Sequence, residues 1–307
     1  MNAVPIVYLI FNRPEVTRRS FEVLRALRPA RLLVVADGPR PNIPEDAEKC
    51  RLTREIATAV DWPCQLQTDF SETNLGLKPR IVSGLNWAFT QVEAAIVIED
   101  DCLPDATFFR FAAEMLEKFR DDRRIMCVSA NNFQEGRRRT EDDYYFSRYP
   151  HCWGWATWRR AWRHFDPDLK LWPRLREGGW LRDILQDEAA VPYWQGIFDR
   201  CAAGKINSWA FPWTYSCWVQ SGLTVLPNQN LVQNIGFGRD GTNTTSADNP
   251  ASHLTVSPLS FPLRHPAWVI RDAAADAFTQ YRQYAPPALP RWKRALRRLR
   301  AAFNLGR

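Results

Sequence analysis

Residues 94–105 read AAIVIEDDCLPD, in which an uninterrupted apolar run meets three consecutive carboxylates. An apolar run rich in β-branched residues and without polar alternation is typical of a strand that is buried on both faces. Carboxylates that directly follow such a strand lie at the carboxyl edge of the sheet, and open α/β sheets bind their ligands at that edge. The stretch therefore predicts an α/β fold with an acidic ligand site.

The three carboxylates are Glu99, Asp100 and Asp101, and they point alternately if the strand continues through them. They therefore do not all serve one ion: one or two can bind a hard cation, while the others bind hydroxyl groups of a ligand. The alternative is an acidic turn that caps the helix beginning near Asp105. A cap needs only one carboxylate and three adjacent ones repel each other, so we favour the ligand site.

Strand and helix patterns alternate on both sides of this stretch. Residues 4–11 predict a first strand, the spacing over 15–27 predicts a helix with Pro14 in its first turn, and residues 31–36 predict a second strand. A strand, a helix and a strand in this order form a βαβ unit, so the sheet is expected to be mostly parallel. Further helices are predicted over 50–60, 79–90 and 106–120, and further strands over 64–68, 125–130 and 223–226.

Polar residues follow the predicted strands. Arg13 and Asp37 come after the first and second strands and are expected at the same sheet edge as the acidic stretch. Lys78 and Arg80 stand where the helix over 79–90 begins, and the free amides of a helix N-terminus attract anions such as phosphate. An ordinary capped loop explains these two residues equally well.

Aromatic residues dominate the second half of the chain. Trp155, Trp158 and Trp162 recur three and four residues apart and predict one buried face of a helix. Trp153 and Gly154 precede that helix, and a flat ring beside a residue without a side chain favours a platform for stacking a sugar. Mostly helical spacing is expected over 172–200, a second aromatic segment over 208–219, and a lid over the site in the glycine-containing loop 234–246.

The net charge of +7 is concentrated in a tail, because residues 291–307 hold seven arginines and lysines and no acidic residue. The rest of the chain is close to neutral and has no zinc-finger spacing or basic recognition helix, which argues against nucleic-acid binding. Trp292, Leu296, Leu299 and Phe303 share one helical face of this tail, which predicts binding to an anionic membrane surface. The alternative, a tail that packs on the rest of the protein or is partly disordered, explains this pattern equally well.

The seven cysteines lack CxxC spacing, and reduced thiols are the simplest interpretation of them. The chain has neither a charged segment followed by a long apolar stretch near its start nor eighteen successive uncharged apolar residues. We therefore expect a cytoplasmic protein that attaches peripherally to the inner face of the plasma membrane through residues 291–307.

Taken together, the motifs resemble the GT-A nucleotide-sugar glycosyltransferases, in particular the N-acetylglucosaminyltransferase I type and its bacterial relatives. The resemblance covers most of the chain, and the order and spacing of its motifs are more specific than any single motif. The strongest motif is residues 97–101 with Pro104-Asp105 and Phe108-Phe109. The others are Phe11-Asn12-Arg13, Ala36-Asp37-Gly38, Cys127-Val128-Ser129-Ala130, Cys152-Trp153-Gly154-Trp155 and Phe237-Gly238-Arg239.

The resemblance implies a GT-A (Rossmann-like) α/β fold with an aromatic-rich acceptor half. It divides the chain into a nucleotide-sugar-binding half over 1–130, an acceptor half over 131–265 and a C-terminal tail over 266–307. The implied activity is metal-dependent transfer of a hexosyl or N-acetylhexosaminyl group from a nucleotide-sugar, in the first place a UDP-sugar, to a glycan or lipid-linked acceptor. Bacterial surface polysaccharide synthesis is the expected setting.

The resemblance also implies roles for individual residues. Asp101 would hold Mn²⁺ (or Mg²⁺), Glu99 the donor sugar, Asp100 the ribose or the sugar, Asp37 the uracil and Arg13 the nucleotide. The remaining donor-binding residues are expected to be Phe11, Asn12, Lys78, Arg239, Thr242 and Asn243, and the acceptor-binding residues Trp153, Gly154, Trp155 and Trp209.

One departure from the family concerns the catalytic base. The animal enzymes carry an Asp before a Trp in the stretch that corresponds to 208–213, whereas this chain has no carboxylate there. Asp199, and less so Asp183, are candidates by region only, and an inverting or a retaining outcome stays open. The alternative functions are a non-catalytic carbohydrate- or nucleotide-binding protein and a sugar-phosphate nucleotidyltransferase, which needs a Gly-rich loop after the first strand.

Overall fold

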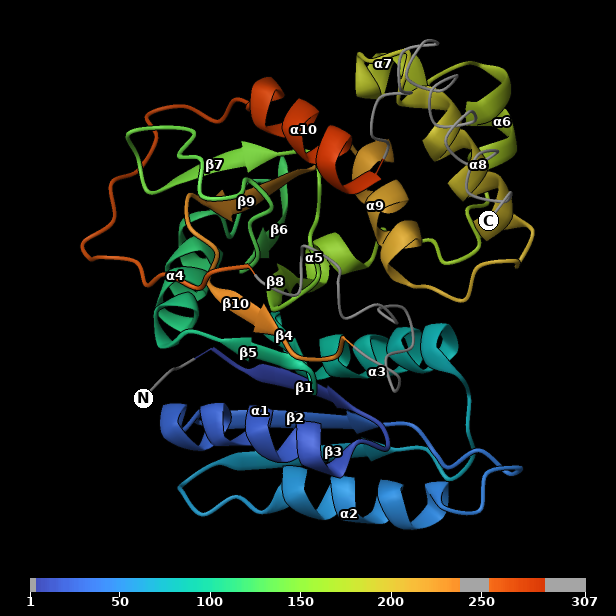
Figure 1. Cartoon of the computed structure of the whole chain (residues 1–307), viewed down its shortest axis with the longest axis vertical. Helices are drawn as coiled ribbons and strands as arrows, with labels where there is room; N and C mark the ends of the chain where they lie inside the picture. The colour runs from blue at the N-terminus through green and yellow to red at the C-terminus, as the bar shows by residue number, and fades with distance from the viewer. Residues whose placement is uncertain (1–3, 238–253, 285–307) are drawn as a thin grey trace, which may run out of the picture.

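The computed structural model describes residues 4–237 and 254–284, which fold around an eight-stranded sheet with the strand order β3-β2-β1-β4-β8-β6-β9-β7 (Figure 1). Four neighbouring pairs are parallel and three are antiparallel, since β8 and β7 run against their neighbours. The strands are β1 (Ile6–Ile10), β2 (Arg31–Ala36), β3 (Gln65–Phe70), β4 (Ala94–Glu99), β6 (Ile125–Ser129), β7 (Tyr144–Ser147), β8 (Trp155–Trp158) and β9 (Leu223–Pro227).

The predicted α/β class, with a mostly parallel central sheet flanked by helices, is confirmed. The first half supplies α1 (Pro14–Leu27), α2 (Asp46–Thr58), α3 (Leu77–Gln91) and α4 (Ala106–Lys118). Each lies within one or two residues of its predicted start or end, except that α2 begins four residues earlier. One hydrophobic core joins the sheet to α1 and α4, and a second joins the opposite face of the sheet to α3. Both faces are therefore covered, which explains why β1, β2 and β4 are almost continuously apolar.

The predicted helical stripe of Trp155, Trp158 and Trp162 is wrong. Trp155–Trp158 is strand β8, and only the short α5 (Arg159–Trp162) is helical. In a strand, alternate residues face opposite sides, so Trp155 packs in the core on the α3 side and Trp158 in the core on the α1 and α4 side. Two aromatic residues three positions apart, such as Trp155 and Trp158, fit a strand as well as a helix when both faces of the strand are buried.

A helical cap stands beside the sheet and consists of α6 (Trp172–Glu177), α7 (Leu181–Leu185), α8 (Val191–Ala202) and α9 (Ala210–Val219) (Figure 1). The helical spacing predicted over 172–200 is thus realised as three separate helices. The cap has its own aromatic core, in which Trp194, Phe198 and Trp218 are buried. α10 (Ala273–Thr279) and a following π-helix (Gln280–Tyr284) connect this cap to β7.

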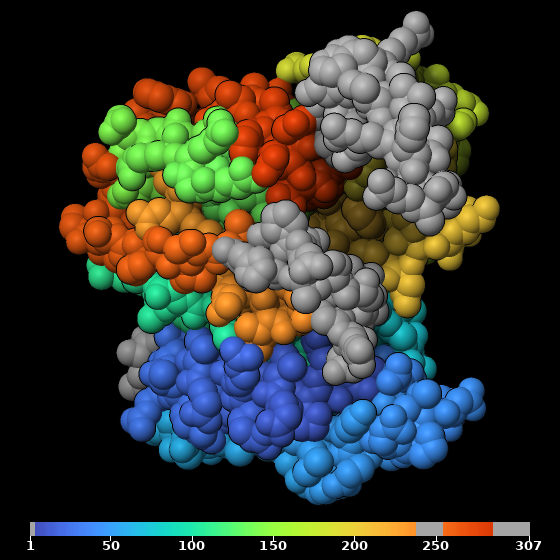
Figure 2. Space-filling view, viewed as in Figure 1, coloured from blue at the N-terminus to red at the C-terminus, as the bar shows by residue number. Residues whose placement is uncertain are grey.

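The surface view shows how the two halves of the chain meet. The N-terminal units, in blue, form one end of the molecule, while the segment after residue 254, in orange and red, lies beside residues near 140 in green (Figure 2). A bridge between Phe146 and Arg271 joins these two segments. The tail 291–307 and most of the lid 234–246 lie outside the described residues, so their predicted roles stay predictions. In the described part of the chain, no helix is long and apolar enough to cross a membrane.

Candidate functional site

The acidic stretch forms a tight turn at the carboxyl end of β4, as the sequence predicts. β4 ends at Glu99, and the amide of Asp100 still donates to Leu9 of β1 at 3.0 Å. The chain then enters β5 (Cys102–Pro104), which pairs with β10 (Val232–Asn234) in a small antiparallel sheet. The carbonyl of Asp101 accepts from Ile235 at 2.8 Å. Backbone bonds on both sides therefore fix where the three carboxylates lie.

Arg13 lies between two of these carboxylates. It follows β1 directly, and its guanidinium forms ion pairs with Asp100 and, at 3.1 Å, with Asp101. The Arg13 side chain is 20% exposed, and those of Asp100 and Asp101 are 3% and 12% exposed. The prediction that Arg13 shares the sheet edge with the acidic stretch is confirmed. A partly desolvated cation thus compensates two buried anions.

The carboxylates of Glu99 and Asp101 can each accept further hydrogen bonds or bind a cation. Glu99 is partly exposed and forms no hydrogen bond or ion pair with any residue of 4–237 or 254–284. Asp101 accepts a weak bond from the Cys102 thiol at 3.5 Å on one oxygen. Its other oxygen lies so near Gly236 that a Cβ there would stand 2.2 Å away, so only glycine fits beside it.

The electrostatics of the turn favour an additional cation. Burial first, and then the charges of Asp101 and Asp100, raise the pKa of Glu99. Burial likewise raises the pKa of Asp100, against the opposing effect of Arg13. Burial by itself lowers the pKa of Arg13. Asp100 and then Asp101 together raise that pKa by more than burial lowers it, so the guanidinium stays charged. When all three carboxylates are ionised, the one guanidinium that pairs with Asp100 and Asp101 leaves a surplus of two negative charges, and a bound cation would favour this ionised state.

A divalent metal fits this surplus charge, but the chain does not offer it a complete shell. Within the described ranges, no group of three or more His, Cys, Asp or Glu side chains is arranged to hold a metal. Asp101 and the unpartnered Glu99 are the oxygen donors closest to such a role. Mg²⁺ and Mn²⁺ accept oxygen ligands from phosphates and water, so an ion here would depend on a bound phosphate for its remaining ligands.

Three of the residues expected to bind the nucleotide, Asp37, Asn12 and Phe11, contact other residues of the protein. The two oxygens of Asp37 accept four bonds, from the amides of Gly38, Leu75 and Gly76 and from the side chain of Asn74. Asp37 therefore holds the 74–76 loop against the end of β2. Asn12 donates to Asp46 at 2.8 Å, and the Phe11 ring lies beneath the guanidinium of Arg40.

The two basic residues at the start of α3 differ. Lys78 is paired with Asp168 at 3.8 Å and its own amide donates to Asn207. Arg80 is buried, and its guanidinium bonds the carbonyl of Ala36 and both the carbonyl and carboxylate of Asp69. Arg80 thus fastens α3 to the ends of β2 and β3. The remaining donor-side expectations, Arg239, Thr242 and Asn243, lie outside the described residues.

Of the expected acceptor residues, two lie beside the acidic turn and two lie in the core. The β4–β8 register pairs Val97 with Trp155, so the Trp153-Gly154 segment continues alongside Glu99. Gly154 has φ +65°, and a Cβ there would stand 3.3 Å from Ala130 and 3.6 Å from Ile98. Trp153 is half-buried, whereas Trp155 and Trp209 are 0% and 3% exposed and stack on each other.

Asp199 lies in the helical cap. It accepts from the indole of Trp172 at 2.9 Å and pairs with Arg176 at 3.0 Å. These are the only bonds of its carboxylate within the described residues, and neither reaches the acidic turn. The structure does not bring Asp199 together with the other predicted catalytic residues.

Sequence reasoning passed over the polar residues that follow β6. Asn131 accepts from the amide of Trp153 at 3.2 Å and from the Ser129 hydroxyl at 3.1 Å, and Phe133 packs edge-on against the Trp153 ring. The available signal was position: like Arg13 and Asp37, Asn131 directly follows a buried strand. The antiparallel β8, which brings Trp153 to that strand end, had been predicted as a helix.

No protein-family model and no curated protein matches the chain. Among solved structures, it is similar to mouse xyloside xylosyltransferase 1, with 9% identity over 70% of this chain and 80% of that one and a TM-score of 0.36. It is also similar to a UDP-glucose pyrophosphorylase complexed with UDP-glucose, with 10% identity, 73% and 90% coverage and a TM-score of 0.34. A third, mannose-1-phosphate geranyltransferase from Thermus thermophilus, has 12% identity, 74% coverage of each chain and a TM-score of 0.34. Likenesses this distant carry no functional argument, which rests on the site itself.

Proposed function

We propose that the chain is a metal-dependent glycosyltransferase that moves a sugar from a nucleotide-sugar, in the first place a UDP-sugar, to a hydroxyl of a glycan or lipid-linked acceptor. The observation that carries the proposal is the turn at the end of β4, where Asp100 and Asp101 share one guanidinium and the Glu99 carboxylate has no partner among the described residues. A surplus of negative charge at a ligand-binding sheet edge favours a divalent cation together with a diphosphate. The partnerless Glu99 is free to bind sugar hydroxyls.

In this reaction the bond between the sugar carbon and the diphosphate oxygen breaks, and a bond from that carbon to the acceptor oxygen forms. Mn²⁺ or Mg²⁺ held by Asp101 would supply neutralisation of the negative charge that develops on the leaving diphosphate. Arg13 fixes Asp100 and Asp101 in place and adds positive charge beside them. Glu99 orients the donor sugar, and Trp153 receives the acceptor. The acceptor hydroxyl releases its proton as the new bond forms.

Calorimetric titration with UDP, with and without Mn²⁺, tests the proposal. We expect tight binding only with the metal, and we expect Asp101→Asn to reduce the affinity to its metal-free level while the fold stays intact. Asp61→Asn, a change at an exposed carboxylate whose one ion-pair partner among the described residues is Arg25, is the matched control. UDP binding that is equal with and without metal would refute the metal role.

A non-catalytic nucleotide- or carbohydrate-binding protein is the second candidate, because residues 208–213 hold no carboxylate to serve as a base. Metal-dependent hydrolysis of at least one nucleotide-sugar favours the enzyme, whereas binding without any turnover favours the second candidate. A nucleotidyltransferase is disfavoured, since β1 runs into α1 through Phe11-Asn12-Arg13 without a glycine-rich loop. We further propose a cytoplasmic site of action in surface polysaccharide synthesis, at an anionic membrane reached through residues 291–307.

A further inference from the structure

Two buried polar atoms, in segments that adjoin Trp153, have no hydrogen-bond partner in the part of the chain that the structure describes. The side-chain nitrogen of Asn131 (Nδ2) and the Nε2 of His151 are shielded from solvent, in residues that are 1% and 3% exposed. Leaving such a group unpaired costs on the order of 1–3 kcal/mol, so each is expected to find a partner in the working protein. The two atoms belong to one local structure, since the Ser129 hydroxyl bonds both the Asn131 side chain and the carbonyl of His151.

This local structure borders the acidic turn. The Asn131 oxygen accepts from the amide of Trp153, and the amide of Ala130 donates to Gly154 at 2.7 Å. The His151 ring stands 4.7 Å from that of Phe133, which in turn contacts the Trp153 ring at 5.3 Å. The indole N–H of Trp153 also has no partner among the described residues. Asn131, His151 and Trp153 thus each keep a hydrogen-bonding group without a partner in the described residues, and the β4–β8 register places Trp153 alongside Glu99.

We propose that Asn131 and His151 form the polar floor of the acceptor subsite and bind hydroxyl or amide groups of an uncharged sugar that stacks on Trp153. The inference rests on the proposed glycosyl transfer and deepens it by naming the class of acceptor. Burial lowers the pKa of His151 to about 3, so its ring is neutral at physiological pH. Within residues 4–237 and 254–284, no arginine or lysine bonds or pairs with any of these side chains, and the β4–β8 register places the acidic Glu99 next to Trp153. Such surroundings disfavour an anionic sugar.

The test uses the full chain and a panel of methyl glycosides. The neutral probes are the methyl glycosides of glucose, galactose, mannose and N-acetylglucosamine, and the acidic probe is that of glucuronic acid. Binding is followed by saturation-transfer NMR and titration, both with and without UDP and Mn²⁺. We expect at least one neutral glycoside to bind and the acidic one to bind more weakly.

His151→Phe separates a ligand-binding role from a packing role. Phenylalanine keeps the ring contacts with Phe133 and Tyr149 but removes the unpaired nitrogen, so a packing residue would leave glycoside affinity unchanged. We expect an affinity loss of about tenfold with an unchanged or raised thermal midpoint. Asn131→Asp, which keeps the accepting oxygen and loses the N–H₂ group, is expected to act in the same direction.

Tyr215→Phe is the matched control, because the Tyr215 hydroxyl is also buried and unpaired but lies in the helical cap. It should leave glycoside affinity unchanged. Equal glycoside affinity of the parent protein and His151→Phe, a preference for the glucuronic acid glycoside, or no glycoside binding would each overturn the inference. Failure of the proposed function is distinct, since it appears as absent UDP binding in the parent protein.

Discussion

At the residue scale, three adjacent carboxylates have three different surroundings. Asp100 is buried against Arg13, Asp101 shares Arg13 and abuts Gly236, and Glu99 has no partner in the described residues. The chain leaves β4 after Glu99 and turns at Asp100 and Asp101, so these two carboxylates reach Arg13 and that of Glu99 does not. Arg13 is the only cation among the described residues that pairs with any of the three. It therefore determines how much negative charge the turn retains.

Replacement of Arg13 tests this dependence. Arg13→Met leaves the charges of Asp100 and Asp101 buried without compensation, so we expect the free energy of unfolding to fall by roughly 3 kcal/mol in urea denaturation. Arg51→Met is the matched control, because Arg51 pairs with Glu48 and Glu55 through side chains that are more than half exposed. Exposed pairs contribute little, so that variant should be close to the parent. Equal losses in both variants would contradict the assigned role of Arg13.

At the element scale, the acidic stretch combines two functions that the sequence presents as alternatives. Helix α4 is capped, but by Asp105, whose carboxylate accepts from the amide of Thr107 at 2.8 Å. Residues 99–101 take no part in that cap and are left for the site. The helix then anchors the turn through Phe108, Phe109 and Phe111, which are buried beneath the sheet.

Asp105→Ala separates the cap from the site. Loss of an N-cap carboxylate typically costs about 1 kcal/mol, and we expect a decrease of that size in the free energy of unfolding. Metal-dependent UDP binding should stay near the parent value, because Asp105 belongs to the helix and not to the turn. An Asp105→Ala variant that folds normally but binds UDP much more weakly would show that the cap and the site are not separable.

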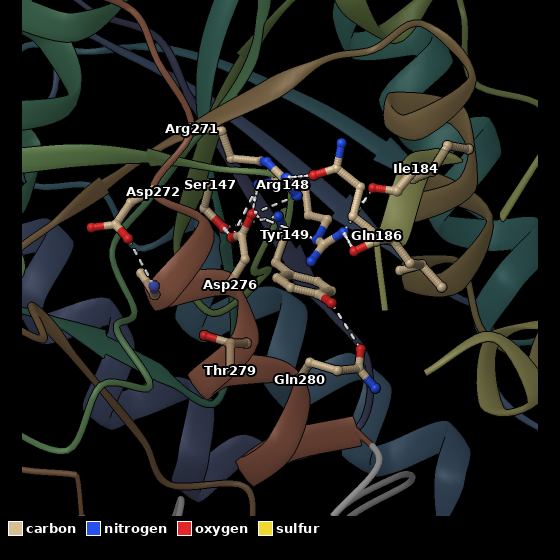
Figure 3. Close-up of polar contacts among 12 residues, drawn as sticks. Ser147, Arg148, Tyr149, Ile184, Gln186, Arg271, Asp272, Asp276, Thr279 and Gln280 are labelled. Atoms are coloured by element: carbon tan, nitrogen blue, oxygen red, sulfur yellow. Dashed lines mark hydrogen bonds and ion pairs between the residues drawn. The ribbon is translucent and has the colours of Figure 1, made fainter. Parts of the chain in front are cut away.

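At the scale of the whole molecule, the helical cap is fastened to the sheet by a buried polar network around Asp276 (Figure 3). Asp276 of α10 accepts from the Ser147 hydroxyl at 2.5 Å and pairs with Arg148 and Arg271. Arg148 also donates to the carbonyls of Ile184 and Leu185 at the end of α7. Three segments far apart in the sequence thus meet around the buried pair of Arg148 and Asp276. This network fixes the orientation of the chain that leads from β7 to His151 and Trp153.

The network makes stability depend on pH. Burial, opposed by Arg148, raises the pKa of Asp276 from 3.8 to about 6. Because the folded state has the higher pKa, the stabilising contribution of the protonated form is fully present below pH 3.8 and is lost as the pH rises through 6. Relative to Asp276→Asn, the parent protein should gain on the order of 1 kcal/mol of unfolding free energy between pH 7 and pH 5.

The measurement is urea denaturation of both proteins at each pH, since the difference between them cancels all other titrating groups. Asp61→Asn, at an exposed position, should show no such pH-dependent difference. A difference between the parent and Asp276→Asn that stays constant, or that reverses in sign, would contradict a raised pKa for Asp276.

The basic tail is tested by liposome binding. Residues 291–307 hold the seven charges that equal the net charge of the chain, so a truncation before residue 291 removes the expected electrostatic attraction. We expect the full chain to sediment with vesicles containing an anionic phospholipid, and binding to be lost on truncation, in neutral vesicles or in high salt. Binding that is insensitive to salt would reject the electrostatic form of this proposal.

The sequence by itself determined the order of strands and helices in the first half and the edge at which the acidic stretch lies. Local hydrophobic spacing and strand ends encode both, because they depend on neighbours within a few residues. Only the tertiary structure decided that Trp155–Trp158 is a strand. Both faces of this segment are buried, so its sequence lacks the apolar–polar alternation that identifies a strand. It also decided that Arg13 compensates Asp100 and Asp101, that Asp199 belongs to the helical cap, and that Asn131 and His151 flank Trp153. These contacts join residues far apart along the chain, and no local pattern in a single sequence specifies which distant groups meet.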